Sequence, residues 1–112
     1  MGLAPAPQNF EGSLLVSQLY NNGLIPEQTF GWDLGTNGTP SITLGGVNPK
    51  YNSQMFKIPL KSNFYWTVPV TRYFGGGTDW RPQARQAIFD SGTSLLLLHP
   101  EDWQNLNENI ID

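Results

Sequence analysis

The sequence predicts an all-β fold, made mainly of short strands with a few short helices. The 112 residues include 12 glycines and 9 prolines, which are typical of the turns that join short strands. Several segments alternate apolar and polar residues, the pattern of strands with one buried face. Hydrophobic residues make up 38% of the chain. With the glycines added, this share is near that of a soluble domain, so a packed core is expected.

Near the N-terminus, residues 13–20 predict a short helix. Leu15 and Leu19 lie four positions apart, so a helix places them on one face. Ser13 is a suitable N-cap for this helix, and Gly23 is suited to end it.

Residues 29–34 and 41–44 predict the two strands of a hairpin. The connecting turn, residues 36–40, contains Asn-Gly, which supplies the positive backbone dihedral angles that a hairpin turn needs. The first strand alternates so that one face carries three apolar side chains, namely Phe30, Trp32 and Leu34.

The second half of the chain predicts further strands, in the order 56–60, 65–74, 78–81, 86–89 and 95–98. Pro59 and Pro69 lack an amide hydrogen, which places two of these strands at an edge or a bulge. A helix is expected to start at Pro100, because proline suits the first helical turn. Glu101 and Asp102 follow it, where negative charge is favoured by the helix dipole.

Composition argues against several functional classes. The net charge is −3 and the basic residues are scattered, so no nucleic-acid partner is expected. No run of about 18 apolar residues occurs in the sequence, so no membrane-spanning helix is predicted. With no cysteine and one histidine, neither a metal site nor another cofactor is expected. That histidine, His99, precedes Pro100 and is expected to cap the helix or to be exposed.

Residues 87–95, Ala-Ile-Phe-Asp-Ser-Gly-Thr-Ser-Leu, carry the strongest chemical signal. A carboxylate at the end of an apolar run is costly to bury unless hydrogen bonds or chemistry compensate it. Gly92 permits a tight turn, and the hydroxyls of Ser91 and Thr93 are placed to hold a carboxylate. The segment therefore predicts a catalytic Asp90 on a turn between two core strands. The alternative is an aspartate that only ends a strand in an Asx turn.

The segment Phe-Asp-Ser-Gly-Thr-Ser, residues 89–94, resembles the second active-site motif of the pepsin-like aspartic proteases, Asp-Thr/Ser-Gly-Thr/Ser. Other segments resemble the same family in its order and spacing, so the resemblance covers essentially the whole chain. They are Gly2-Leu3-Ala4-Pro5, residues 22–25 with 30–34, Leu44-Gly45-Gly46-Val47-Asn48 and Phe64-Tyr65-Trp66. Asn48 stands where the family has an aspartate.

This resemblance implies a middle fragment of a two-lobed acid protease fold. Residues 1–44 are then the end of the N-terminal lobe and the inter-lobe segment, and residues 45–112 are the first part of the C-terminal lobe. The family uses two aspartates, one from each lobe, and this chain contains one Asp-Ser/Thr-Gly motif. The parent is expected to be an aspartic endopeptidase that hydrolyses peptide bonds with an activated water. The isolated chain is expected to be inactive.

The resemblance also implies roles for individual residues around the catalytic Asp90. Ser91 takes the position whose hydroxyl reaches the motif of the opposite lobe, Gly92 allows close backbone approach, and Thr93 hydrogen-bonds the carboxylate. These three residues therefore support the active site.

Tyr65 and Thr67 take positions that line a substrate pocket in the family, although an aromatic residue on a strand more often packs in the core. The expected partners are a peptide or protein substrate and the missing parts of the two-lobed fold, with no nucleic acid and no membrane. The resemblance favours a secreted protein or a lysosomal or vacuolar one.

Two other functions remain open. In a homodimeric protease each chain gives one aspartate, but there the motif lies early and a flap follows it, whereas Asp90 lies near the end of this sequence. A non-catalytic pepsin-like relative that binds another protein is the second alternative. The intact motif argues against this alternative, because an inactive site need not keep the hydroxyl residues that hydrogen-bond the aspartate. A serine hydrolase is disfavoured, because no histidine is placed to act as the base for Ser91 or Ser94.

Overall fold

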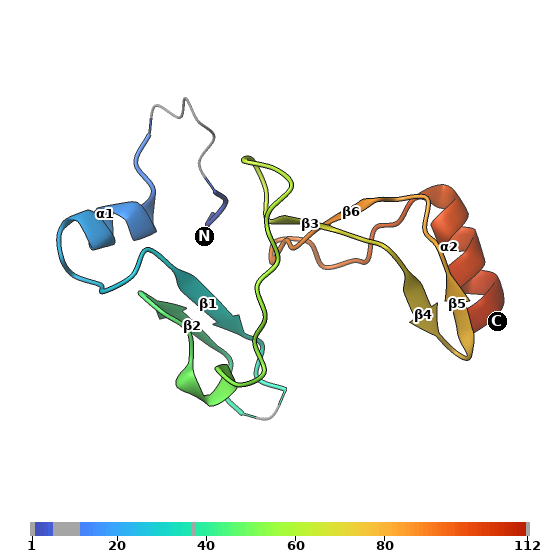
Figure 1. The fold of residues 1–112 in the computed structure, drawn as a ribbon, viewed down its shortest axis with the longest axis horizontal. Helices are drawn as coiled ribbons and strands as arrows, with labels where there is room; N and C mark the ends of the chain where they lie inside the picture. The colour runs from blue at the N-terminus through green and yellow to red at the C-terminus, as the bar shows by residue number, and fades with distance from the viewer. Residues whose placement is uncertain (1, 6–11, 37, 112) are drawn as a thin grey trace. The chain divides into compact units, whose positions relative to one another are not determined.

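The computed structural model describes residues 2–5, 12–36 and 38–111 (Figure 1). The chain divides into two compact units, Met1–Lys57 and Ile58–Asp112. Within the described residues, six short strands form three two-stranded antiparallel sheets, accompanied by short helices. The mainly β class predicted from the sequence is confirmed. The predicted lobe boundary between residues 44 and 45 concerns a larger, two-lobed fold and stays a prediction.

The first unit begins with helix α1, Leu15–Asn21. It starts later than predicted, with Leu14 as its N-cap and no side-chain hydrogen bond to the cap, so the expected cap at Ser13 is wrong. The buried residue of the helix is Val16, whereas Leu15 is 42% exposed. The spacing of the two leucines therefore predicted the helix but not the side that packs.

The end of α1 agrees with the prediction. Gly23 has a φ of +69°, a left-handed conformation that glycine adopts without steric cost. Its amide donates a hydrogen bond to the carbonyl of Tyr20 at 3.0 Å, which satisfies one of the free carbonyls at the end of the helix.

The predicted hairpin is confirmed. Strand β1, Phe30–Asp33, pairs antiparallel with β2, Ser41–Leu44. In this register Phe30 lies opposite Leu44 and Asp33 lies opposite Ser41. Of the predicted turn, residue 37 lies outside the described residues. After β2, the amide of Gly45 donates to the carbonyl of Thr29 at 2.8 Å, which continues the pairing by one residue.

A single 3₁₀ turn, η1 (Pro49–Tyr51), follows the hairpin. Asn48 caps it, because its side-chain oxygen accepts a hydrogen bond from the amide of Lys50 at 3.1 Å. Asparagine is among the best N-cap residues, so the asparagine that replaces the expected aspartate still caps this turn.

The second unit contains two small sheets. Strand β3, Thr67–Pro69, pairs with β6, Gln86–Ile88. Strand β4, Tyr73–Gly75, pairs with β5, Thr78–Trp80. The single strand predicted over residues 65–74 is therefore two strands with different partners. The break follows Pro69, a residue that cannot donate a ladder hydrogen bond.

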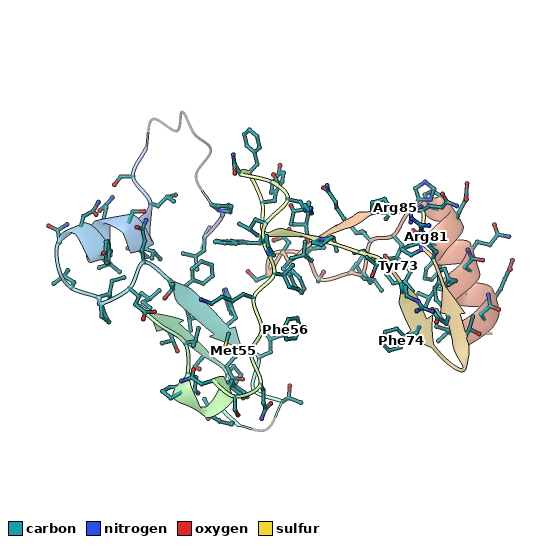
Figure 2. All side chains as sticks on the ribbon, in the orientation of Figure 1. Met55, Phe56, Tyr73, Phe74, Arg81 and Arg85 are labelled. Atoms are coloured by element: carbon teal, nitrogen blue, oxygen red, sulfur yellow. The ribbon has the colours of Figure 1, made fainter. Side chains whose placement is uncertain are left out.

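The β4–β5 hairpin has one packed side and one open side. Tyr73 meets the ring of Trp80 edge-on, with 5.5 Å between the ring centroids. Phe74, the next residue, points to the other side of the strand (Figure 2) and is 83% exposed. The alternation of β4 is thus preserved, but only one of its aromatic residues finds a partner within this unit.

Two predicted strands are wrong. Residues 56–60 and 95–98 have no regular secondary structure. Leu95, Leu96 and Leu97 are 73–75% exposed, so they do not form the expected core strand. An apolar run favours a strand only when another strand is present to pair with it, and none of the described strands pairs with either segment.

The unit ends with helix α2, Pro100–Leu106, which continues into the wider π-type turn η2, Asn107–Ile111. The predicted helix start is confirmed, with proline in the first turn and His99 as the N-cap. The Nδ1 atom of His99 accepts a hydrogen bond from the amide of Glu101 at 3.3 Å. The histidine therefore has the capping role expected from its position.

Candidate active site

Asp90 lies on a turn directly after strand β6, as predicted. The amide of Phe89 still donates to the carbonyl of Trp66 at 3.0 Å, so pairing with the neighbouring chain continues until one residue before Asp90. The side chain of Asp90 is exposed. The expected second core strand after the turn is absent, so the β3–β6 pair supports the turn from one side within this unit.

Hydrogen bonds from the turn itself hold the carboxylate of Asp90. Its Oδ1 atom accepts a hydrogen bond from the amide of Gly92 at 2.9 Å. Its Oδ2 atom accepts one from the Oγ1 of Thr93 at 2.6 Å. A Cβ atom at position 92 would lie 3.2 Å from Oδ1 of Asp90, so glycine gives the carboxylate room to approach the backbone.

These hydrogen bonds keep Asp90 charged. The Thr93 hydroxyl and then the Gly92 amide lower the pKa of Asp90, and they outweigh the small opposing effect of burial. Donors that bind the ionised form of an acid stabilise it. The result is an exposed carboxylate that is fixed in direction and able to accept a proton. Ser91, between Asp90 and Gly92, is exposed on the same turn.

The two predicted substrate-binding residues differ in exposure. Tyr65 is 56% exposed, and its carbonyl accepts a hydrogen bond from the amide of Thr67 at 2.8 Å. Thr67 is 3% exposed and lies opposite Ile88, two residues before Asp90. Its buried Oγ1 has no hydrogen-bond partner among the described residues. Both residues thus lie on or beside the strand that supports the Asp90 turn, and only Tyr65 offers its side chain to solvent.

Comparison with known proteins decides the family. A model of the eukaryotic aspartyl protease family matches residues 1–111. The chain belongs to this family. Gastricsin from Suncus murinus is 33% identical to this aspartyl protease chain in an alignment of 104 residues that covers 86% of the chain and 27% of the gastricsin. Gastricsin from Homo sapiens is 31% identical in an alignment of 104 residues that covers 86% of the chain and 26% of its own length.

A fungal relative extends the comparison. An aspartic protease from Phaffia rhodozyma is 28% identical over 93 residues, which are 82% of this chain and 23% of that protein. The present aspartyl protease chain therefore spans about a quarter of the length of the relatives it matches. Its resemblance to pepsin-like proteases, drawn from short segments, is confirmed at the level of the family.

A second turn in this aspartyl protease chain has nearly the same local geometry as the Asp90 turn. Oδ1 of Asp33 accepts a hydrogen bond from the amide of Gly35 at 2.9 Å, and Oδ2 accepts one from the hydroxyl of Tyr51 at 3.0 Å. The Gly35 amide and then Tyr51 lower the pKa of Asp33, against a smaller effect of burial. Asp33 is half-buried, however, and its hydroxyl donor lies 18 residues away. A held carboxylate is thus not by itself diagnostic. Asp90 differs from Asp33 in being exposed and in having both donors within three residues.

Asp102 lies in the first turn of α2, as predicted. Unlike a residue that acts only on the helix dipole, it is 1% exposed. Its oxygens accept hydrogen bonds from the amides of Gln83 and Ala84 at 2.8 and 3.0 Å. Burial alone raises the pKa of Asp102, but these two amides, with the charges of His99 and Arg85, lower it overall. No sequence signal pointed to this contact, because the partners are main-chain groups.

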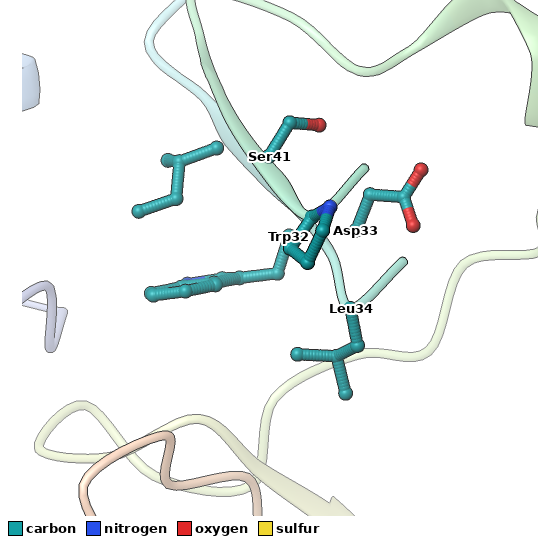
Figure 3. A pocket seen from close by; sticks show the side chains of 6 residues that line it. Trp32, Asp33, Leu34 and Ser41 are labelled. Atoms are coloured by element: carbon teal, nitrogen blue, oxygen red, sulfur yellow. The ribbon is translucent and has the colours of Figure 1, made fainter. Parts of the chain in front are cut away.

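An open hollow of about 260 Å³ lies on the β1–β2 hairpin, in the first unit (Figure 3). Its lining is mostly apolar: Trp32, Asp33, Leu34, Pro40, Ser41 and Ile42. The ring of Trp32 and the carboxylate of Asp33 point in different directions from the strand (Figure 3). The Asp33 oxygens are already occupied by Gly35 and Tyr51, so the hollow presents hydrophobic surface and no free acid.

Within residues 2–5, 12–36 and 38–111, no group of three or more histidine or acidic side chains could hold a metal ion. No helix in the same ranges is long and apolar enough to cross a membrane.

Proposed function

We propose that this chain supplies one catalytic aspartate, Asp90, to a pepsin-like aspartic endopeptidase. The observation that carries the proposal is the exposed carboxylate held by the Gly92 amide and the Thr93 hydroxyl. Membership of the aspartyl protease family gives this carboxylate its chemical context. The proposed reaction is the hydrolysis of peptide bonds by an activated water, without a covalent intermediate.

Asp90 acts in this proposal as one member of a pair. Two carboxylates held in contact cannot both ionise, so one stays protonated while the other is charged. The charged member removes a proton from water and the protonated member donates one toward the scissile carbonyl. The lowered pKa of Asp90 suits the charged role. The second aspartate comes from a part of the whole protein outside this sequence, and the isolated chain is inactive.

The surrounding residues take supporting roles in the same proposal. Ser91 reaches toward the motif of the opposite lobe, while Gly92 and Thr93 fix the direction of the carboxylate. Tyr65 contacts the substrate on the side of the leaving chain, which its exposure permits. Thr67 shapes the same pocket through the backbone of β3.

The setting of the site follows from the same proposal. Residues 1–44 belong to the N-terminal lobe and the inter-lobe segment, and residues 45–112 open the C-terminal lobe. The substrate is a peptide or protein, and the protein works in a secreted, lysosomal or vacuolar setting.

The test compares this chain with the full-length product of its gene. Hydrolysis of a denatured protein substrate is measured at about pH 3–5, near the ordinary range of carboxylate pKa values, with and without pepstatin. The full-length protein is also prepared with Asp90→Asn, which is expected to lower kcat at least about 100-fold. Asp79→Asn is the matched control, because Asp79 is an exposed carboxylate that pairs with Arg72 on the β4–β5 hairpin.

Pepstatin-sensitive activity in the full-length protein alone, lost in Asp90→Asn and kept in Asp79→Asn, supports the proposal. Full activity of the Asp90→Asn protein contradicts it. Activity of the short chain by itself would mean that two copies assemble a site. An inactive full-length protein with an intact upstream motif would favour the non-catalytic, protein-binding relative.

A further inference from the structure

Asp102 carries a charged side chain in a buried position, and this combination needs a structural or functional explanation. A carboxylate that is 1% exposed is costly to remove from water unless hydrogen bonds compensate it. Both of its oxygens are used, one by the amide of Gln83 and one by the amide of Ala84. An aspartate exposed on the surface of α2 would be hydrated and would need neither hydrogen bond. The two hydrogen bonds therefore connect α2 to the chain segment before β6.

The link closes the segment that carries Asp90. The two hydrogen bonds span 19 and 18 residues. Between their ends lie β6, the Asp90 turn and the exposed residues 95–97. Asp102 therefore ties the start of this segment to its end. The sequence has no cysteine, so no disulfide makes this connection.

Successive contacts lead from the link to the candidate active site. Arg85 follows Ala84 directly, and its guanidinium donates to the carbonyl of Pro82 at 2.6 Å. The carbonyl of Arg85 accepts a hydrogen bond from the amide of Val70 at 2.9 Å, beside the β3–β6 ladder. The last contact before Asp90 is the bond from the amide of Phe89. These contacts connect residues 83–84 to β6 and, through the backbone after β6, to the turn that carries Asp90.

We propose that Asp102 is a positioning residue for Asp90, acting as a hydrogen-bonded clamp that fixes the register of β6 and the direction of the turn after it. The inference rests on the proposed catalytic role of Asp90. Small displacements of a reacting group cost large factors in rate, so a clamp outside the site affects turnover without touching substrate.

The electrostatic surroundings keep the clamp closed in acid. The amides of Ala84 and Gln83 outweigh the effect of burial, and the charges of His99 and Arg85 add to theirs, so that the pKa of Asp102 is lowered. Burial and then the charge of Asp102 raise the pKa of Tyr73 in β4. Asp102 therefore stays ionised at pH values where an ordinary aspartate begins to protonate.

The test uses the full-length protein with Asp102→Asn and Asp102→Ala, and Asp79→Asn as the control. Asparagine keeps the shape of the side chain and one acceptor oxygen, so it guards against failure of the alanine variant to fold. Amide hydrogen exchange at residues 83–89 is the first readout. We expect exchange at least about tenfold faster in the Asp102 variants and unchanged exchange in the control, because each lost acceptor frees an amide.

The second readout separates positioning from folding. Active sites are counted by pepstatin titration, and kcat is expressed per active site. We expect kcat to fall at least about tenfold in Asp102→Asn with KM unchanged. Unchanged kcat per active site with fewer active molecules would overturn the positioning role and leave Asp102 as a purely structural residue.

The third readout is the NMR signal of the Asp90 side-chain carboxyl carbon, which does not depend on activity. We expect this signal to move in Asp102→Asn and to stay in place in Asp79→Asn. If the wild-type protein hydrolyses no peptide, the proposed function fails. The NMR signal of the Asp90 carboxyl carbon then tests by itself whether Asp102 positions Asp90. An unmoved signal together with faster exchange at residues 83–84 overturns the inference.

Discussion

At the scale of single residues, the threonine of the motif has the closest contact with the candidate catalytic acid. Its hydroxyl lies 2.6 Å from Oδ2 of Asp90 and is the largest cause of the lowered pKa. The amide of Thr93 also donates to the Asp90 carbonyl at 3.1 Å. Thr93 thus holds the backbone of the turn and lowers the pKa of the carboxylate.

Replacement of this hydroxyl tests its role. In the full-length protein, Thr93→Val keeps the shape of the side chain but removes the donor, so we expect the pKa of Asp90 to rise and kcat to fall about tenfold. Thr93→Ser keeps the hydroxyl and is expected to retain most of the activity. Side-chain NMR titration and steady-state kinetics measure the two effects. Equal behaviour of the valine and serine variants would contradict this role.

The pH dependence of stability is set in part by Asp102, whose folded-state pKa is lowered. A lowered pKa gives stability that is fully present above the unfolded-state value, about 3.9, and that is lost as pH falls through the folded-state value. Asparagine does not titrate. We therefore expect the free energy of unfolding to be higher for the wild type than for Asp102→Asn. This difference is expected to be largest above about pH 4 and to shrink below it. Urea denaturation of the two full-length proteins at several pH values measures this difference, and a constant difference would contradict it.

At the scale of elements, Gly45 joins the β1–β2 hairpin to the chain after α1. Its φ is +85°, and a Cβ atom there would lie 2.6 Å from the Cβ of Ile25. Gly46 follows it without a positive φ, and a Cβ atom there would meet nothing within 4 Å. The two neighbouring glycines therefore have different reasons to be present.

This contrast predicts different effects of one substitution. Gly45→Ala is expected to lower the free energy of unfolding by about 1–2 kcal/mol from the left-handed backbone alone, with a further cost from the clash at Ile25. Gly46→Ala is expected to change it by less than about 0.5 kcal/mol. Urea denaturation midpoints of the full-length protein distinguish them. A smaller loss in Gly45→Ala than in Gly46→Ala would show that the hairpin packs differently.

Elements that depend on near neighbours in the sequence were predictable. The hairpin follows from alternation and a turn, the start of α2 follows from Pro100, and the Asp90 turn follows from Gly92 and its hydroxyl neighbours. Each of these signals is complete within about ten residues, so the rest of the fold does not need to be known.

Elements that depend on a distant partner were not predictable. Residues 56–60 and 95–98 have strand-like sequences but find no strand to pair with. Asp102 has the sequence position of a helix-dipole residue, yet its side chain binds two amides 18 and 19 residues away. The periodicity of apolar residues predicts which face of a helix or strand is buried. It carries no information about which loop packs against that face.

At the scale of the whole molecule, the chain exposes more surface than its size requires. Its accessible surface is 8995 Å². Two separate compact units, each of half the mass of 12.5 kDa, would together expose only about 7400 Å². Among the described residues, Val16 is the one buried hydrophobic side chain in the core, while Phe56, Phe74 and Leu34 are 78–83% exposed.

The excess apolar surface predicts association of the isolated chain. Exposed apolar patches and unpaired strand edges favour contacts between copies, so we expect the 112-residue chain to sediment as oligomers at micromolar concentration. The full-length protein, at the same concentration, is the comparison and is expected to sediment as a single species. Analytical ultracentrifugation measures both. A monomeric short chain with a cooperative thermal transition would contradict the prediction.

The local support of Asp90 has a consequence for inheritance. Among the described residues, the donors to its carboxylate lie within three residues and the side chain is exposed, so its replacement opens no cavity in this unit. A gene copy that loses this aspartate would still encode a protein that folds and accumulates. Selection against the substitution would then act only through the loss of catalytic activity. Loss of Asp102 would instead be felt in the fold itself. Relatives that have lost proteolytic activity but still bind proteins would thus be expected to have a substitution at position 90 and to retain the aspartate at position 102.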